Sequence, residues 1–529
     1  MTVPSGQPLR TARSALWVAV GILCSRLTGL VRQRVFAHYF GLGPEADAFL
    51  AAFRIPNFLQ NLFGEGALSA SFIPVYASLV AHGERRHADR VAGAVASLLA
   101  LVVSGIVLIG VLATPAMIAV IAPGFTGATR ELTIEVVRIL FPGAGLLVLS
   151  AWCLGVLNSH HRFLISYLAP VAWNAAMIVT LLFFGGHTAL PRLAVILAWG
   201  SVAGSALMFG VQVPAVLHSA PELRLAFDVA SHEVRTVVRN FIPVFISRGV
   251  VQVSAYVDTL IASLLPSGAV AGLTNAQTLY LLPVSLFGMS VSAAELPRMS
   301  GVVTADAGGA AGALRLRLDA GLRQIAFFVV PSAMAFLGLG DVIAAALLQT
   351  GRFGHADAMY VWGILAGSAV GLLASTLGRL YSSSYYALRD TRTPLRFAIV
   401  RVVLTTALGY VFAIPFPRWL GVSERWGVAG LTASAGIAGW IEMLMLRRTL
   451  NARIGHTGLA AEYVIRLWTA SASGAAVAWA IKVAVPVENP IIAAILILAP
   501  YGLVFLTVAF ALGIPEASSA VGRLRQRRS

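Results

Sequence analysis

A run of strongly polar residues interrupts a long apolar stretch near the beginning of the chain. Residues 53–66 read FRIPNFLQNLFGEG, and polar side chains recur there at spacings of three, four and four residues: Arg54, Asn57, Asn61 and Glu65. At about 100° per residue of an α-helix, these side chains share one side of the helix. An arginine in the middle of a bilayer costs about 2.5–3.5 kcal/mol on insertion scales, so it usually faces a cavity or a partner. The segment therefore predicts a polar helix face inside the membrane.

The preceding apolar segment brings more cations into the same region. Residues 25–34 read SRLTGLVRQR and contain Arg26, Arg32 and Arg34. On a helix, Arg26 and Arg32 are about 120° apart, so they can edge a cavity without forming one line. The planar guanidinium forms paired hydrogen bonds with phosphate oxygens. Arg26, Arg32 and Arg54 are therefore predicted to line a wet cavity that accepts an anionic group.

Internal pairing is the alternative interpretation of these cations. Glu65 and Asp47 can neutralise two of the arginines, and Arg34 can lie at the membrane interface. In either case the carboxylates belong to the same polar region as the arginines.

Later apolar segments carry further charged residues. Arg379 begins a helix face that continues through four polar residues: Ser382, Ser383, Tyr386 and Asp390. Small polar residues also hold membrane helices together, so this face has a structural interpretation as well. Arg248 and Asp258 lie in one segment and Glu295 in the next, and a structural Arg248–Glu295 pair is the simpler interpretation of these charges.

No motif in the sequence indicates an enzyme. The ten histidines show no ligand spacing, and Cys24 and Cys153 lie singly inside apolar runs. There is no nucleophile elbow, P-loop or metal motif, and the lack of a P-loop argues against ATP hydrolysis. We therefore predict no catalytic residues and no cofactor.

Membrane helices must position these residues. Of 529 residues, 58% are hydrophobic and only 11% are charged, whereas soluble proteins usually carry about 25% charged residues. The mean hydropathy is +0.83. Such a chain cannot cover itself with a polar surface, so the composition predicts an all-α polytopic membrane protein. The first apolar run continues to Phe40 without a small-residue cleavage site, so no cleavable signal peptide is expected.

The net charge of +16 has a topological explanation. Arginines concentrate in alternate polar segments: 81–90, 222–239, 298–317, 389–396, 447–453 and 523–528. The loops between them contain no arginine: 41–46, 123–129, 266–272 and 486–490. This is the positive-inside pattern of a membrane protein and not a nucleic-acid surface. Both termini are therefore predicted to be cytoplasmic, which requires an even number of spans.

Gly, Pro and charged residues divide the chain into fourteen predicted spans. They lie near 14–40, 46–80, 88–122, 130–158, 163–185, 189–217, 233–265, 273–303, 313–349, 356–388, 394–416, 426–450, 462–485 and 489–514.

The two halves of this pattern resemble each other. The LFG triplet at 62–64 recurs at 286–288, and FIP at 72–74 aligns with ELP at 295–297. Because the repeat restarts six helices later, we predict two six-helix lobes around a central cavity, a transporter design, followed by two C-terminal helices. The predicted divisions are an N-lobe at 1–220, a C-lobe at 221–455, and helices 13 and 14 with a basic tail at 456–529.

Several stretches resemble one family, the MurJ (MviN) lipid II flippases of the MOP exporter superfamily. They are SRLTGLVRQRVFAHYFG, DAFLAAFRIPNFLQNLFGEGALSASFIPVYA, GVLNSHHRFLISYLAPVAWN, LYLLPVSLFG and YYALRDTRTP. The resemblance implies a flippase that moves undecaprenyl-pyrophosphate carrying a disaccharide-pentapeptide from the cytoplasmic to the periplasmic leaflet. It also implies functionally required arginines at Arg26 and Arg32, a basic residue at Arg54, and acidic positions at Asp47 and Glu65.

The sequence departs from the family at several positions. Gln60 and Thr278 stand where many members have arginine, which implies fewer cations in the cavity unless Arg248 contributes. Some members bind sodium in the C-lobe, and Asp258 matches one ligand position, but Thr405 and Gly409 are poor replacements for the others. The driving force is left open between a membrane potential and an ion gradient.

The resemblance implies a bacterial inner-membrane location and lipid II as partner, together with membrane lipids; the cell wall synthesis machinery is a further candidate partner. The alternative functions are a flippase for another polyprenyl-linked glycan of the O-antigen type and a MATE-type drug antiporter. An antiporter for cationic drugs would need an acidic cavity, whereas the predicted cavity is basic. A glycan polymerase would need a catalytic acid in an outer loop, and those loops are short and mostly uncharged.

Overall fold

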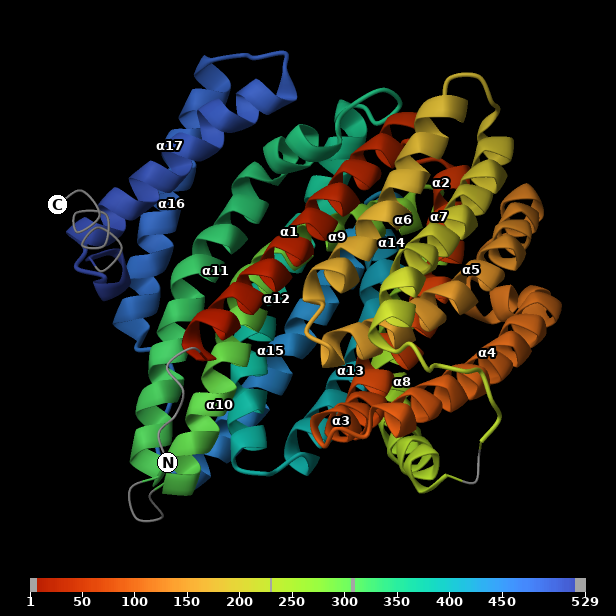
Figure 1. Cartoon of the computed structure of the whole chain (residues 1–529). Coiled ribbons are helices and arrows are strands. Elements are labelled where there is room, and N and C mark those ends of the chain that lie inside the picture. Colours follow the sequence, from red (N-terminus) through yellow and green to blue (C-terminus); the bar gives the residue numbers. More distant parts are fainter. Residues whose placement is uncertain (1–6, 229–230, 306–309, 519–529) are drawn as a thin grey trace. The chain divides into compact units, whose positions relative to one another are not determined.

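The computed structural model describes residues 7–228, 231–305 and 310–518, without the side chains of residues 7–19, 56, 64–66, 246–255, 303–305 and 310. These residues are almost entirely helical (Figure 1). Contacts group the chain into two compact units, Met1–Val270 with Thr350–Arg352 and Ala271–Gln349 with Phe353–Ser529. Contacts place helix α8, which follows residue 220, in the first unit, where it packs against α3 and α4. The boundary between the lobes at residue 220 stays a prediction.

The first unit contains the helices that carry the predicted cation site. They are α1 (Gln7–Phe40), α2 (Pro44–Asn61), the π-helix η1 (Leu62–Leu68), α3 (Ser69–Ala81), α4 (Arg85–Ile121), α5 (Gly127–Ser159), α6 (Phe163–Phe184), α7 (Leu190–Ser219) and α8 (His232–Ser263). Helix α5 packs against α2, α4 and α7, and α6 packs against α1 and α7. The polar segments of α1 and α2 are thus held by α5 and α6.

The second unit has the same all-helical character. Its elements are α9 (Ala269–Pro283), the π-helix η2 (Val284–Met289), α10 (Ser290–Ala305), α11 (Ala310–Leu348), α12 (His355–Ala387), α13 (Arg392–Ala413), α14 (Pro415–Trp419), the 3-10 helix η3 (Glu424–Trp426), α15 (Gly427–Ile454), α16 (Ala461–Ala484) and α17 (Pro490–Ala511). Helix α12 packs against α11 and α15. A Cβ on Gly371 would lie 2.4 Å from the Cα of Gly436, so only glycine permits the α12–α15 approach at this point.

Eleven helices in the described part of the chain are long and apolar enough to cross a membrane. This finding confirms the prediction of an all-α polytopic membrane protein, and the eleven helices coincide with eleven of the fourteen predicted spans. The other three predicted spans correspond to α1, to α2 through α3, and to α8. These three segments contain most of the charged residues that the sequence assigned to the predicted site.

A π-helix interrupts one span in each unit at the repeated LFG triplet. Residues 62–64 lie in η1 and residues 286–288 lie in η2. Wider i→i+5 hydrogen bonding appears mostly as single-turn bulges, frequently at functional sites. The polar stretch that begins at Arg54 therefore runs from α2 into a π-helix.

The last two helices form a hairpin against α11 (Figure 1). Helix α11 has a non-helical residue at Leu339, where its axis kinks. Next to the kink, Asp341 is 5% exposed and forms an ion pair with Lys482 of α16. The Tyr501 hydroxyl of α17 donates a hydrogen bond to the Pro331 carbonyl at 2.6 Å. An ion pair and a hydrogen bond therefore fix the hairpin on both sides of the kink.

The arginine-free loops of the first unit meet at one end of its helices. Asp47, in the first turn of α2, accepts a hydrogen bond from the Gly268 N–H at 2.6 Å. The Gly124 N–H donates to the Ser263 hydroxyl at 3.3 Å. These hydrogen bonds connect three loops that the sequence assigned to one side of the membrane, and that assignment stays a prediction.

The turn between α12 and α13 explains the YYALRDTRTP stretch. Arg389 has a left-handed φ of 59°, and Asp390 follows it. The Asp390 carboxylate accepts hydrogen bonds from the backbone N–H and the hydroxyl of Thr393 and pairs with Arg453 at 2.8 Å. These interactions, the Thr393 hydrogen bonds first, lower the pKa of Asp390 to about 2. Asp390 therefore stabilises the turn as a permanent carboxylate.

Candidate functional site

Arg32, on α1, faces α2 and α6, where its guanidinium contacts two aromatic rings. Its guanidinium carbon is 5.2 Å from the centroid of the Phe53 ring and 5.4 Å from that of Trp173. One guanidinium nitrogen, Nη1, lies 3.8 Å from the Met177 sulfur. Within the described chain Arg32 forms no ion pair with a carboxylate. Its positive charge is thus half-buried next to the rings and has no carboxylate partner among the described residues.

The two rings are themselves fixed in position. Phe53 and Trp173 stack with centroids 5.4 Å apart and an interplanar angle of 5°. The Trp173 indole N–H donates to the carbonyl and the hydroxyl of Ser201 on α7, each at 3.2 Å. Cation–π contacts are worth about 0.5–2 kcal/mol each and orient the planar guanidinium. Phe53 and Trp173 are therefore part of the candidate site.

The sequence interpretation missed these two aromatic residues. Both occur in the stretches that carry the family resemblance, in AAFRIPN and in APVAWN. A phenylalanine next to Arg54 and a tryptophan in an apolar helix are ordinary packing residues in sequence, so nothing in the pattern separated them from the core.

Arg54 lies on α2 opposite α8. Its backbone carbonyl accepts a hydrogen bond from the Tyr256 hydroxyl at 3.0 Å, and its guanidinium interacts electrostatically with Asp258. Tyr256 also meets Phe58 edge to face, with centroids 5.3 Å apart. Because Arg54 and Asp258 attract each other, the Asp258 carboxylate is a poorer ligand for a sodium ion than its sequence position implied. Among the described residues, no group of three or more His, Cys, Asp or Glu residues is arranged to hold a metal ion.

The remaining residues of the predicted polar face differ in exposure. Arg26 is exposed on α1, Arg34 is half-buried, and Asn57 is half-buried on α2. Asn61 is exposed at the end of α2. The side chain of Glu65 lies outside the described residues, so its role stays a prediction.

Asp47 lies at the end of the unit where the arginine-free loops meet. It is 3% exposed, and its bond to Gly268 holds a loop whose φ of +90° requires glycine. The Asp47 carboxylate therefore has a structural role, because it accepts a hydrogen bond from a buried backbone N–H. The sequence predicted a binding role for it as well.

We expect Asp47→Ala to destabilise the protein. The change leaves the buried Gly268 N–H without its acceptor, which costs about 1–3 kcal/mol. Thermal unfolding of the purified protein in detergent measures the effect. Glu45→Ala, in the same first turn of α2, is the matched control and should leave the unfolding midpoint nearly unchanged. Equal midpoints for Asp47→Ala and the unchanged protein would contradict the structural task.

Several weaker candidates come from later helices of the chain. Glu295 pairs with Arg298 at 2.9 Å and lies 3.7 Å from Arg317. The side chain of Arg248 lies outside the described residues, so the Arg248–Glu295 pair stays a prediction. The Thr278 hydroxyl donates to the Thr274 carbonyl of its own helix at 2.9 Å, so it supplies no charge where many relatives have arginine.

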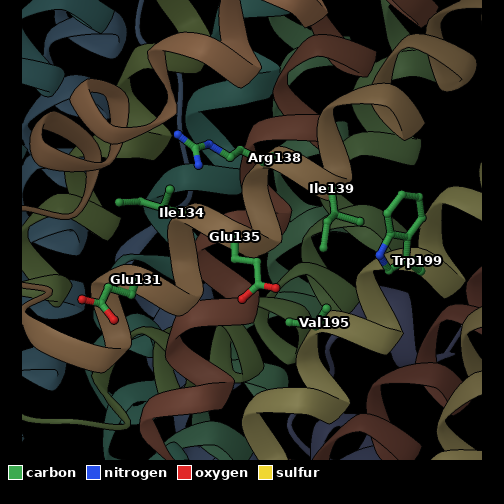
Figure 2. A pocket seen from close by; sticks show the side chains of 7 residues that line it. All are labelled: Glu131, Ile134, Glu135, Arg138, Ile139, Val195 and Trp199. Atoms are coloured by element: carbon green, nitrogen blue, oxygen red, sulfur yellow. The ribbon is translucent and has the colours of Figure 1, made fainter.

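One pocket in the described part of the first unit is separate from the candidate site. It has a volume of about 540 Å³ and lies between α5 and α7 (Figure 2). The lining includes Glu131, Glu135, Arg138 and Trp199. None of its lining residues belongs to the polar segments of α1 and α2, so its size carries no functional argument.

A family model and a related protein identify the same family. The family model described as "Lipid II flippase MurJ" matches residues 36–507. The lipid II flippase MurJ of Burkholderia cenocepacia is 31% identical over 448 residues, covering 83% of this chain and 84% of that protein.

Solved structures show the same fold. The structure of a lipid II flippase MurJ in an inward closed conformation has a TM-score of 0.77 and 24% identity, covering 93% of this chain and 98% of that chain. An inward-facing multidrug resistance MATE family transporter of the MOP superfamily has a TM-score of 0.64 and 18% identity, covering 83% and 98%. At these identities the structural likeness establishes the fold alone.

Proposed function

The chain belongs to the MurJ family of lipid II flippases, transporters of peptidoglycan synthesis, and we propose from this premise how its residues act on the substrate. Lipid II binds through its pyrophosphate to the arginines of α1 and α2 and crosses from the cytoplasmic to the periplasmic leaflet by alternating access. Arg32 carries this proposal, because it presents a positive charge beside the stacked rings of Phe53 and Trp173 without a carboxylate partner among the described residues. A pyrophosphate supplies the missing negative charge.

The other residues of the polar face complete the proposed site. Arg26 and Arg54 add cations, and the amides of Asn57 and Asn61 add hydrogen-bond donors and acceptors. Arg379 is an additional candidate in the second unit. The driving force is proposed to be the membrane potential or an ion gradient.

The proposed architecture includes details that the observed helices alone do not establish. It has fourteen spans, two six-helix lobes around a central cavity, and α16 and α17 as an addition. Its support is the positive-inside pattern together with the repeated π-helices at the LFG triplets. The inner membrane is the proposed location, with both termini cytoplasmic.

Reporter fusions test the orientation. We expect fusions after Gly41 and Gly268 to report a periplasmic position and fusions near Arg86 and Arg453 a cytoplasmic one. The hydrogen bond between Asp47 and Gly268 supports placing the first two loops on one side. A cytoplasmic signal at Gly268 would contradict the fourteen-span topology.

Rescue of a bacterial strain depleted of its own lipid II flippase tests the function. The chain should restore growth and normal cell shape at a membrane abundance comparable to that of the replaced protein. If the protein inserts at that abundance and the cells still lyse, the substrate is another polyprenyl-linked glycan or a different molecule.

A further inference from the structure

A second cluster of charged and hydroxyl groups lies wholly within the second unit. Four helices contribute to it: Tyr280 from α9, Ser375, Arg379 and Tyr386 from α12, Arg401 from α13 and Glu442 from α15. Arg401 and Glu442 played no part in the prediction from sequence, because they are single charges in separate apolar helices.

Side-chain contacts and electrostatic interactions connect the members of this cluster. Arg401 Nη1 lies 3.1 Å from Glu442 Oε2, across the packed helices α13 and α15. The Tyr280 hydroxyl and the Ser375 hydroxyl are 2.8 Å apart. Both guanidinium groups, of Arg379 and Arg401, interact electrostatically with Tyr280, and Glu442 interacts with Tyr386. The six side chains therefore form one electrostatic neighbourhood.

The cluster lies at membrane depth. Arg379 is eight residues before the end of α12, Arg401 nine residues after the start of α13, and Glu442 twelve residues before the end of α15. At a rise of 1.5 Å per residue these positions are about 12, 14 and 18 Å from the helix ends. In the proposed topology these ends are cytoplasmic. With a hydrocarbon core of about 30 Å, the cluster is in or near its cytoplasmic half.

Charges at this depth require water or a ligand. Arg379 is exposed, and its guanidinium has no ion-pair or hydrogen-bond partner among the residues that the structure describes. Beyond the two exposed arginines of its first turns, Arg392 and Arg396, helix α13 exposes large apolar side chains, among them Leu395, Ile399 and Val403, as suits a surface toward lipid. Arg401 lies instead on the side of α13 that meets α15. Intramembrane charges that avoid lipid mark substrate pathways.

The charge balance identifies the kind of ligand. Two arginines and one glutamate leave one net positive charge, which matches a single carboxylate. The guanidinium of Arg379 can donate two parallel hydrogen bonds to a carboxylate. The hydroxyls of Ser375, Tyr280 and Tyr386 add further donors. A pyrophosphate carries more negative charge and fits the arginines of the first unit better.

We propose that this cluster binds a carboxylate of the peptide portion of the substrate. The proposal rests on the proposed function, since it takes lipid II as the substrate. The pyrophosphate and the peptide are then recognised by separate units of the protein. Arg379 is the principal contact. Glu442 orients the guanidinium of Arg401, the second cation of the cluster, through their ion pair.

Binding measurements on the purified full-length protein test the proposal. The two probes are lipid II with its pentapeptide and the same polyprenyl-pyrophosphate disaccharide without peptide. Arg379→Gln should weaken binding of the peptide-bearing lipid by about tenfold to a hundredfold, the range for a hydrogen bond to a charged group. Binding of the peptide-free lipid should change less than about twofold. Arg418→Gln, which breaks an exposed pair with Glu424, is the matched control and should alter neither.

A second set of variants separates binding from folding. Arg401→Gln leaves Glu442 without its partner, so it is compared with the double variant Arg401→Gln/Glu442→Gln. The double variant should recover the unfolding midpoint of the unchanged protein and still bind the peptide-bearing lipid more weakly. If it recovers both stability and full affinity, the pair has no part in binding.

The outcomes distinguish this proposal from the function on which it rests. An equal loss for both lipids in Arg379→Gln would assign the cluster to the pyrophosphate and overturn the proposal, and so would unchanged binding of both. If the unchanged protein binds neither lipid while it is folded, the proposed function itself is contradicted.

Discussion

Arg32→Ala is expected to abolish rescue of a flippase-depleted strain while the protein still reaches the membrane at normal abundance. The substitution removes the positive charge that lies beside the stacked rings of Phe53 and Trp173. No described carboxylate loses a partner, so the change strands no opposite charge in the membrane. The loss should therefore appear in transport and not in folding, measured as colony formation together with the amount of protein in the membrane.

Companion substitutions sharpen this result. Arg32→Lys keeps the charge but loses the planar group that stacks on the rings, so we expect partial rescue. Arg26→Ala should also fail, and Arg379→Ala should be milder because the pyrophosphate arginines remain. Arg192→Ala, exposed near the start of α7, is the matched control and should rescue fully. Normal growth of both Arg26→Ala and Arg32→Ala would leave the phosphate-binding cavity without support.

Single substitutions at Arg54 and Asp258 are expected to lower the amount of folded protein. The two side chains attract each other between α2 and α8. Removing one member of such a pair leaves an uncompensated charge, which costs about 3–5 kcal/mol when the pair is buried. Arg54→Gln and Asp258→Asn should each reduce membrane abundance and the unfolding midpoint in detergent.

The double variant Arg54→Gln/Asp258→Asn distinguishes structure from transport. It removes both charges, so abundance and the unfolding midpoint should return toward those of the unchanged protein. If Arg54 also binds substrate, rescue should stay impaired after folding has recovered. Full rescue by the double variant would restrict Arg54 to a structural pair. Unchanged abundance of both single variants would show that the attraction is too weak to matter.

The proposed recognition of pyrophosphate and peptide by separate units follows from which arginines have no carboxylate partner among the described residues. Arg32 in the first unit and Arg379 in the second each present a guanidinium without a described carboxylate. Other charged side chains of the membrane helices form ion pairs: Lys482 pairs with Asp341, and Glu295 pairs with Arg298. An unpaired cation in a low-dielectric region is costly, so a bound anion restores the balance.

The sequence by itself determined the class of protein, the positive-inside pattern and the family, because these depend on composition and on residues close together in the chain. The LFG repeat and the RIPN…GEGA segment needed no tertiary information. Eleven apolar helices could be located for the same reason, since about 20 consecutive apolar residues suffice to cross a bilayer.

Only the tertiary structure decided which charges are neutralised and by which residues. The rings around Arg32 come from α2 and α6, residues 53 and 173, and the partner of Arg401 is 41 positions away in α15. Helical periodicity places a residue on a face of its own helix but says nothing about what packs against that face. The π-helix at residues 62–68 is also a feature that the α-helical spacing in the sequence did not predict. Long-range packing therefore fixed the site, because an intramembrane charge takes its role from its neighbours in space.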